Sequence, residues 1–324
     1  MKNKFLSLAL GLGFIFVLIL LLFCGGERLS IWALWNFNDP YSIDHHLLWS
    51  LRIPRLILVF GIGGALAMLG ATYQILFHNP LAEPYLLGVS SAVTLGIVIS
   101  ETLLGWAALT PQAFGMGFLF ALGVITILIL CYYWKAIKNM ERIVLFGMGV
   151  NFVFSSALFI LLSDHNQSNC GGSLRWLFGN IPWLNLNQSM IFISLVLPLC
   201  FTLWILGRYL DGLSLGDSMA RTLGFSPSRM RTFLLVLTSL LLTVITSISG
   251  AIGFIGLVVP HGIRLWVQPP SSRYLLGLSF LIGALFLCLS DSLSRALLPP
   301  LEFPIGIVTT LLGGPLFLYL LWKK

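Results

Sequence analysis

One polar segment, Gln74–Gly88, interrupts an otherwise apolar part of this chain and reads Q-I-L-F-H-N-P-L-A-E-P-Y-L-L-G. Asn79 and Glu83 are expensive in hydrocarbon, and the proline after each of them lacks a backbone N–H for helical hydrogen bonding. Backbone of this kind lies against protein or water rather than lipid. We therefore predict a broken helix beside a polar pathway, with these candidate residues: Gln74, Asn79, Pro80, Glu83 and Pro84.

No catalytic or metal-binding set accompanies this segment in the sequence. The phosphate-binding pattern G-x-x-x-x-G-K-[ST] is missing, and no Ser-His-Asp or paired-carboxylate arrangement is evident. The pair His45-His46 has no third donor nearby, so a solvated loop is favoured over a metal site. We expect no enzymatic activity, no cofactor and no bound metal. The cysteines stand singly and indicate small buried apolar side chains: Cys24, Cys131, Cys170, Cys200 and Cys288.

Composition places these residues in a membrane protein. Apolar residues make up 58% of the 324 residues and charged residues only 9%, and the mean hydropathy is +0.97, outside the range of soluble domains. Since a spanning helix needs about 20 apolar residues, the chain has room for about ten spans with short connections. The expected fold class is an all-α polytopic membrane protein with a single transmembrane domain over residues 1–324.

Apolar runs of suitable length give ten candidate spans. The first, Phe5–Phe23, has a long apolar core without a small-residue cleavage site, which favours a membrane span over a signal peptide. The other candidates are Pro54–Gln74, Tyr85–Leu104, Gly115–Trp134, Ile143–Leu162, Met190–Leu206, Phe233–Ile252, Gly253–Trp266, Tyr274–Leu293 and Ile305–Leu321.

The basic residues orient these spans. Threading them alternately with the N-terminus inside follows the positive-inside rule and puts both termini in the cytoplasm. Anionic lipid of the inner leaflet then accounts for the net charge of +7, so no nucleic-acid partner is needed. Acidic residues gather outside, which admits either a basic docking partner or simple exclusion from the inner leaflet. Five arginines remain outside: Arg28, Arg52, Arg55, Arg175 and Arg295.

Two arginines near the outer surface have two interpretations each, and one acidic residue has a single one. Arg52 and Arg55 flank a proline at an outer helix end, where they either guide solutes at the outer mouth, or cap the helix end or snorkel to the membrane surface. Glu83 is predicted to cap neighbouring backbone amides.

The two halves of the chain share a weak pattern. R-I-P-R at Arg52–Arg55 opens an apolar helix that precedes the N-P break, and R-M-R at Arg229–Arg231 opens one that precedes V-P-H. This rhythm adds Pro260 and His261 to the pathway candidates, the latter as a histidine at a helix break. An inverted repeat is one explanation, with copies at about 50–165 and 228–322, and coincidence in a Leu-rich and Gly-rich chain is the other.

The longest cytoplasmic connection, residues 207–230, is the most polar internal stretch and is too short to be an enzyme. Gly216-Asp217 has the form of a helix start, with a carboxylate near the positive end of the helix dipole, and Leu223-Gly224 has the form of a helix end. A short helix here could fill a groove on a soluble partner. A solvated hairpin is the other interpretation.

Five motifs, in one order along nearly the whole chain, resemble those of the FecCD-type permease subunits of bacterial ABC importers for iron-siderophores, haem and cobalamin. They are R-I-P-R (52–55), G-x-x-x-Q-x-x-x-x-N-P-L-A-E-P-x-x-L-G (70–88), S-L-G-D-S-M-A-R-T-L-G (214–224), G-F-I-G-L-V-V-P-H-G-I-R (253–264) and P-I-G-I-V-T-T-L-L-G-G-P-L-F-L-Y-L-L (304–321).

This resemblance implies a type II ABC importer permease in the bacterial cytoplasmic membrane. A second copy or a paralogue would complete the pathway, with cytoplasmic ATPase subunits below and a periplasmic or lipid-anchored substrate-binding protein above. Closure of the ATPase pair would move the spans through the coupling helix and switch the gates. The resemblance assigns ATPase coupling to Leu215, Gly216, Asp217, Met219, Ala220, Arg221, Leu223 and Gly224.

The chain departs from the family pattern in two places. Arg264 leads into L-W-V-Q-P-P-S-S-R instead of a short Gly-Asp-His-Arg-like turn, and Ser91-Ala92 stands where Ser-Gly-Ala is commoner. The first departure bears on how the loop Gln268–Ser272 contacts an ATPase.

Two other classes remain as alternatives. A stand-alone ion-coupled secondary transporter also uses broken helices, but it would need a buried acidic residue in mid-span, which the sequence does not provide. A membrane scaffold would use the many glycines for helix packing, but it leaves the helix breaks without a purpose. The sequence does not name the transported chelate.

Overall fold

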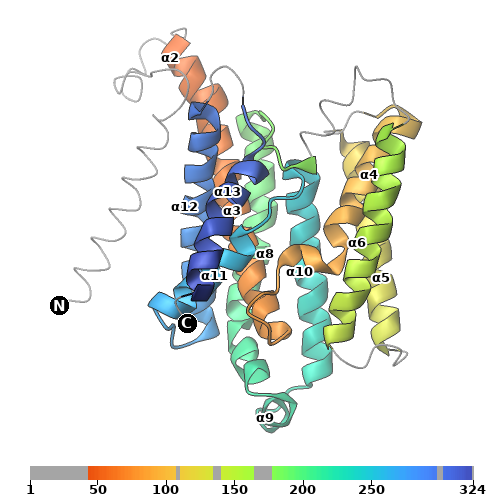
Figure 1. Ribbon diagram of the computed structural model, residues 1–324, viewed down its shortest axis with the longest axis vertical. Coiled ribbons are helices and arrows are strands. Elements are labelled where there is room, and N and C mark those ends of the chain that lie inside the picture. Colours follow the sequence, from red (N-terminus) through yellow and green to blue (C-terminus); the bar gives the residue numbers. More distant parts are fainter. Residues whose placement is uncertain (1–42, 107–109, 134–139, 164–176, 298–301, 323–324) are drawn as a thin grey trace, which may run out of the picture.

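The computed structural model describes residues 43–106, 110–133, 140–163, 177–297 and 302–322, and these residues form helices without any strand (Figure 1). The expected all-α fold is therefore confirmed for the described chain. The elements are α2 (Ile43–His46), η2 (Leu47–Arg52), α3 (Ile53–Leu76), η3 (Pro84–Leu87), α4 (Val89–Leu104), α5 (Pro111–Tyr133), α6 (Met140–Ser163), α8 (Leu186–Ser214), α9 (Asp217–Thr222), α10 (Pro227–Ser249), α11 (Ile255–Trp266), α12 (Ser272–Ala296) and α13 (Ile305–Trp322).

Six helices in the described ranges are long and apolar enough to cross a membrane, and α4 and α13 are shorter apolar helices. Nine of the ten candidate spans coincide with a helix, from α3 through α13. The remaining one, Phe5–Phe23, lies outside the described residues, as do Cys24 and Cys170. The total of ten spans and the position of the N-terminus stay predictions.

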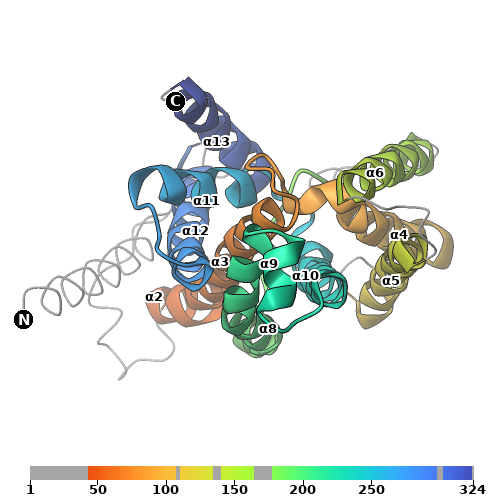
Figure 2. The ribbon, with the colours of Figure 1, turned by 90° about the horizontal axis from the view of Figure 1, so that it is seen from below.

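Helix α3 is the central helix of the bundle. Of its most apolar stretch, 83% is buried, against 28% for α5 and 17% for α6. Seen along the bundle, α3 lies between α8, α11 and α12, while α4, α5 and α6 form a group to one side (Figure 2). An apolar helix that is buried on all sides fits a core position, whereas α5 and α6 leave apolar surface for lipid or another subunit.

Two glycine contacts let α3 approach its neighbours closely. A Cβ atom on Gly70 would lie 1.8 Å from the carbonyl oxygen of Gly256 in α11, and one on Gly63 would lie 2.5 Å from the carbonyl oxygen of Gly283 in α12. Backbones in contact at this distance admit no side chain. Small residues serve the same purpose in membrane helix packing generally.

The chain leaves helical structure after α3 and again after α10. The first break runs from Phe77 to Glu83 and continues through η3, and the second runs from Gly250 to Phe254 before α11 begins. The sequence analysis placed the second break at Pro260 and His261, which is wrong. Both residues lie inside α11, because α11 begins at Ile255 and tolerates the proline.

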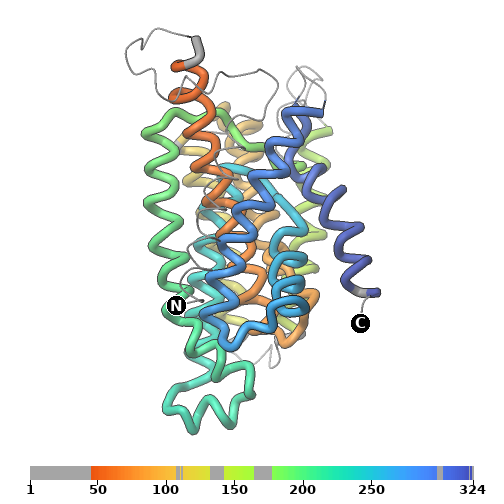
Figure 3. The backbone as a smooth tube through the Cα atoms, turned by 90° about the vertical axis from the view of Figure 1, so that its left-hand side faces the viewer, coloured from red at the N-terminus to blue at the C-terminus, as the bar shows by residue number. Residues whose placement is uncertain are grey.

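The two ends of the bundle differ. Helix α9 protrudes at one end, where α8 and α10 meet, and α2 lies at the other (Figures 1 and 3). Helix α8 has 29 residues, which corresponds to about 43 Å of helix against a hydrocarbon core of about 30 Å. Its last turns therefore extend beyond the core and carry α9 into the aqueous phase. The end of α13 points the same way (Figure 3).

Candidate functional site

The side chain of Gln74 connects the end of α3 to the proline-containing helix α11. Pro260 has no N–H for the carbonyl of Gly256, four residues earlier, which a regular helix would satisfy. The Nε2 atom of Gln74 donates to that carbonyl at 3.3 Å and to the carbonyl of Leu257 at 3.2 Å. Arg264 in turn donates to the Oε1 atom of Gln74. Gln74 thus replaces a missing helical hydrogen bond.

Glu83 and Tyr85 join the first break to the second. The Oε1 atom of Glu83 accepts a hydrogen bond from the backbone N–H of Phe254 at 2.7 Å, and the Tyr85 hydroxyl oxygen accepts one from the N–H of Ile252 at 2.8 Å. Phe254 has φ 70°, which is unusual for a residue with a side chain. Glu83 thus accepts a backbone amide, but the prediction of a neighbouring amide is wrong, because the N–H belongs to the second break, 171 residues away.

The predicted pathway residues separate into two groups. Gln74, Glu83, Pro84 and Pro260 gather around the start of α11. Gln74 and Pro84 contact Gly256, with the Cδ atom of Pro84 2.7 Å from a Cβ built there, and Glu83 binds the N–H of Phe254. Asn79 and Pro80 instead form an exposed turn, in which the Asn79 Oδ1 accepts the N–H of Leu81 at 2.9 Å.

His261 lies apart from both groups. It is buried in α11, and its ring centroid lies 6.5 Å from that of Phe317 in α13. Its pathway role stays a prediction.

A buried ion cluster lies at the end of the bundle opposite α9. Arg55 is only 3% exposed and donates to the Oδ1 atom of Asp291 at 2.9 Å and to the Oε2 atom of Glu302 at 3.1 Å. Arg295 pairs with the other oxygen of Asp291 at 3.0 Å. The guanidinium of Arg55 also lies 4.1 Å from the ring centroid of Trp183.

This cluster changes the interpretation of the predicted outer-mouth residues. Arg55 is paired with two carboxylates inside the cluster, so it does not project into solvent either to snorkel or to guide solutes. The sequence suggested neither partner, because both acids lie more than 230 residues away. Arg52 is also buried, and its outer-mouth role stays a prediction.

The α9 segment, which comprises α9 and its flanking residues from Leu215 to Gly224, exposes apolar side chains to solvent on one face and packs against the bundle with the other. Leu215, Met219 and Leu223 are 65%, 46% and 57% exposed. Asp217 pairs with Arg231 at the start of α10, with its two oxygens 2.6 and 3.1 Å from the guanidinium nitrogens. This bidentate pair fixes the orientation of the helix.

Glycines and one alanine complete the α9 segment. Gly216 and Gly224 have φ of 100° and 87°, a region that favours glycine, and they permit the turns on either side of α9. Arg221 is exposed. Ala220 is fully buried, so its predicted contact with a soluble partner is wrong, since it packs inside this protein.

The divergent loop Gln268–Ser272 lies beside the end of α8. The Asp211 carboxylate accepts the N–H of Ser272 at 2.7 Å, and the Ser271 hydroxyl caps α12 by accepting the N–H of Tyr274 at 3.4 Å. A cleft of about 390 Å³ lies between this loop, Asp211 and Arg264. The loop is therefore tied to the segment that leads into α9.

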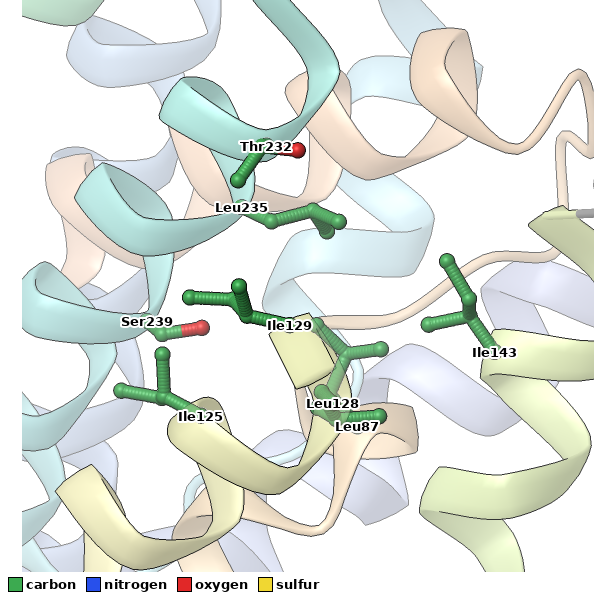
Figure 4. A pocket seen from close by; sticks show the side chains of 8 residues that line it. All are labelled: Leu87, Ile125, Leu128, Ile129, Ile143, Thr232, Leu235 and Ser239. Carbon is green, nitrogen blue, oxygen red and sulfur yellow. The ribbon is translucent and has the colours of Figure 1, made fainter. Parts of the chain in front are cut away.

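A small apolar cavity lies between α5, α6, η3 and α10 (Figure 4). Its volume of about 20 Å³ is close to the space that one water molecule requires. It cannot hold a metal chelate. The described residues contain no cluster of three or more His, Cys, Asp or Glu side chains that could bind a metal ion. The cavity is lined by Leu87, Ile125, Leu128, Ile129, Ile143, Thr232, Leu235 and Ser239.

Several residues of these sites were missed from the sequence. Arg264 and Tyr85 stand within recognised motifs, but nothing in their spacing indicates that they contact Gln74 or the second break. Asn151 donates to the carbonyl of Tyr85 at 2.8 Å, and its position as an amide within an apolar helix is the one signal that could have identified it.

Helix breaks within a membrane bundle, together with a short exposed helix at one end, are features of polytopic transport proteins. The chain belongs to the FecCD transport family, which matches residues 13–323. It is a multi-pass protein of the bacterial inner membrane, and its family consists of transport permeases rather than enzymes.

Individual relatives agree with this assignment. The chain is 36% identical over 304 residues to the hemin transport system permease protein HmuU of Yersinia pestis, covering 93% of this chain and 90% of that one. It is 35% identical over 277 residues to the vitamin B12 import system permease protein BtuC of Salmonella typhimurium, covering 86% and 84%.

A solved structure, described as an inward-facing conformation of a metal-chelate type ABC transporter, superposes with a TM-score of 0.85 at 27% identity. The match covers 97% of this chain and 98% of that one. PsaBC from Streptococcus pneumoniae shares the fold, with a TM-score of 0.54 at 17% identity.

Proposed function

We propose that this chain is the membrane-spanning subunit of an importer for metal chelates of the haem, cobalamin or iron-siderophore class, driven by ATP hydrolysis on separate subunits. The functions of HmuU and BtuC, given by their names, support the substrate class. The observation that carries the proposal is the exposed apolar face of α9, which a stand-alone transporter would not need.

The ATPase partner docks on α9. Leu215, Met219 and Leu223 present apolar side chains to the aqueous phase, which is the chemistry of an anchor for a pocket on a soluble protein. The Asp217–Arg231 pair and the turns at Gly216 and Gly224 hold the helix in place, so that movement of the partner is passed to α8 and α10. Arg221 adds an exposed positive charge to this surface.

The substrate-binding protein, periplasmic or lipid-anchored, docks at the opposite end, around the Arg55 cluster. Glu302 is partly exposed there, and its ion pair with Arg55 ties the segment that leads into α13 to α3. A docked protein that displaced Glu302 would release this segment from α3. This gives a physical route from binding outside to movement within the bundle.

A second copy, or a paralogue, completes the translocation pathway. The weakly buried α5 and α6 leave apolar surface that lipid alone or another subunit can cover. The two helix breaks flank the pathway as the halves of an inverted repeat, about 50–165 and 228–322, since one follows α3 and the other follows α10.

The stand-alone ion-coupled transporter is the alternative. Its requirement for a buried acidic residue is met, among the described residues, only by Asp291, which two arginines hold in ion pairs. Isolation of the tagged chain in mild detergent, followed by mass spectrometry, separates the two proposals. Recovery of a P-loop ATPase in similar amount supports the importer, whereas a chain that purifies alone after gentle cross-linking supports the alternative.

A further inference from the structure

An apolar groove runs along the membrane-facing side of the bundle between α8 and α12, away from the helix breaks and from α9. Its volume is about 590 Å³, within the range of sites that hold small molecules. Phe201 and Trp204 are exposed and stack with ring centroids 5.9 Å apart. The residues that line the groove include Leu197, Phe201, Trp204, Gly277, Phe280 and Leu281.

The groove closes toward the α9 end of the bundle. A Cβ atom on Gly207 of α8 would lie 2.7 Å from the Cγ atom of Arg273 of α12, so the two helices touch there. Farther along, Gly277 has only the Trp204 indole nitrogen near its Cβ position, at 3.7 Å. The helices thus diverge from a contact at Gly207 into an open apolar groove.

Two arginines stand at the closed end. Arg208 follows Trp204 by one turn of α8, and Arg273 precedes Gly277 by one turn of α12. The Arg273 guanidinium lies 5.6 Å from the ring centroid of Trp204 and donates to the carbonyl of Ile205 at 3.0 Å. The Arg208 guanidinium lies 5.0 Å from the ring centroid of Tyr209 and donates to the Tyr209 hydroxyl at 3.4 Å. Each of the two helices therefore carries a positive charge just beyond the closed end of the groove.

No carboxylate neutralises these charges within the described ranges. Neither Arg208 nor Arg273 takes part in an ion pair there, and the Nε atom of Arg273 is buried without a hydrogen-bond partner among the described residues. The nearest acid along α8, Asp211, is engaged by the N–H of Ser272. The site has cationic donors but lacks an anionic acceptor.

We propose that this groove binds an anionic phospholipid from the membrane leaflet on the α9 side. The phosphate lies between Arg208 and Arg273, the glycerol region lies against Trp204, and one acyl chain follows Phe201 and Leu281 along the groove. Guanidinium groups form paired hydrogen bonds with phosphate, and tryptophan favours the headgroup level of a bilayer. The cationic end of the site thus matches the headgroup of a phospholipid, and the apolar groove matches its acyl chain.

The test measures lipid retention by the full-length protein. The protein is reconstituted in nanodiscs of equal parts phosphatidylglycerol and phosphatidylcholine, and the lipids that remain bound after release into mild detergent are counted by native mass spectrometry. We expect retained phosphatidylglycerol in excess. Each arginine near the membrane surface contributes to the attraction of anionic lipid. The double variant Arg208→Gln/Arg273→Gln should therefore retain at least about tenfold less phosphatidylglycerol than the parent protein.

Two further variants separate charge from packing. Arg229→Gln removes an exposed arginine at the start of α10, outside the groove, and should retain phosphatidylglycerol like the parent. Gly277→Leu fills the groove without changing charge and should lower retention of this lipid. Equal retention of both lipids by the parent protein, or unchanged retention in the double arginine variant, would overturn the proposal.

A photo-reactive benzoylphenylalanine in place of Phe201 identifies the occupant directly. Illumination in native membrane should give an adduct with the mass of a phospholipid. An adduct with a peptide from residues 1–42, or with a second copy of the chain, would overturn the proposal and assign the groove to that segment or to a dimer contact.

Discussion

Gln74 supplies, from α3, the hydrogen-bond donor that Pro260 cannot provide within α11. The amide nitrogen of Gln74 lies 3.3 Å from the Gly256 carbonyl oxygen, which faces the nitrogen-bound ring of Pro260 instead of an N–H. The proline and the glutamine therefore form a complementary pair across two helices. The pair fixes α11 against the break that follows α3.

Removal of the Gln74 amide should destabilise the protein. Gln74→Met keeps the length of the side chain but leaves a buried carbonyl unsatisfied, which costs about 1–3 kcal/mol. Thermal unfolding in detergent should show a lower Tm. Pro260→Ala restores an N–H at this position, so adding it to Gln74→Met should recover part of the loss. If the two changes are merely additive, the proline and the glutamine do not form a pair.

The Arg55 cluster should behave as a buried network. Arg55→Leu leaves Glu302 without this partner and Asp291 with Arg295 alone, and breaking such a pair typically costs about 3–5 kcal/mol. The double variant Arg55→Leu/Asp291→Leu should lose less stability than the sum of its single changes. Denaturation midpoints of all four proteins provide the test, and additive losses would contradict a direct interaction.

Salt dependence provides a control for this cluster. Screening acts strongly on exposed charges and weakly on buried ones. The Asp217–Arg231 pair, in which Asp217 is 47% exposed, should therefore contribute less to stability at high salt. The contribution of the Arg55–Asp291 pair should change little over the same range.

Charged substitutions on the α9 surface should leave folding intact but should abolish binding of the ATPase. Met219→Asp and Leu223→Asp alter exposed side chains, so membrane insertion and Tm should stay near the parent values while ATPase capture and transport are lost. Leu104→Asp is a matched control, since Leu104 is 47% exposed, as against 46% for Met219, and lies away from α9 at the end of α4. Normal capture by both α9 variants would remove α9 from the ATPase interface.

Ala220→Glu serves a different purpose. It buries a carboxylate at a fully enclosed position, which is costly without a partner. We expect poor folding, which would abolish transport whether or not α9 binds an ATPase. The variant therefore reports on the fold of the α9 segment rather than on the interface.

Local patterns were enough to find the helices and the two ends of α9. Apolar runs of about 20 residues identify membrane spans because the bilayer sets their length. Gly216 and Gly224 were recognisable because positive φ values favour glycine. The break at Asn79-Pro80 was recognisable for an equally local reason, since polar groups and proline are costly within a lipid-facing helix.

Long-range contacts could not be found in this way. The partners Glu83 and Phe254 are 171 residues apart, and Arg55 and Asp291 are 236 residues apart. No periodicity relates such positions. The misplaced second break has the same cause, because Pro260 is a helix breaker by its own chemistry, and the donor that Gln74 supplies to the Gly256 carbonyl comes from a distant helix. Burial of Ala220 likewise depends on tertiary packing.

The contact between Gly70 and Gly256 gives the sharpest prediction about packing. A methyl group on Gly70 would overlap the Gly256 backbone at 1.8 Å, and backbone atoms cannot move aside as a flexible side chain can. Gly70→Ala should therefore force α3 and α11 apart and disturb the Gln74 and Glu83 hydrogen bonds. The loss in the free energy of unfolding should exceed the typical overpacking cost of about 1–3 kcal/mol, and Tm should fall accordingly.

The matched control is Gly123→Ala in α5, where no atom lies within 4 Å of the added methyl group. Alanine favours a helix interior over glycine by about 1 kcal/mol, so this change should leave Tm unchanged or raise it. Because both substitutions add one methyl group to a helical glycine, helix propensity alone predicts the same sign for both. Opposite signs in thermal unfolding would show that close packing of α3 on α11 decides the effect, and a Gly70→Ala protein as stable as its parent would contradict that contact.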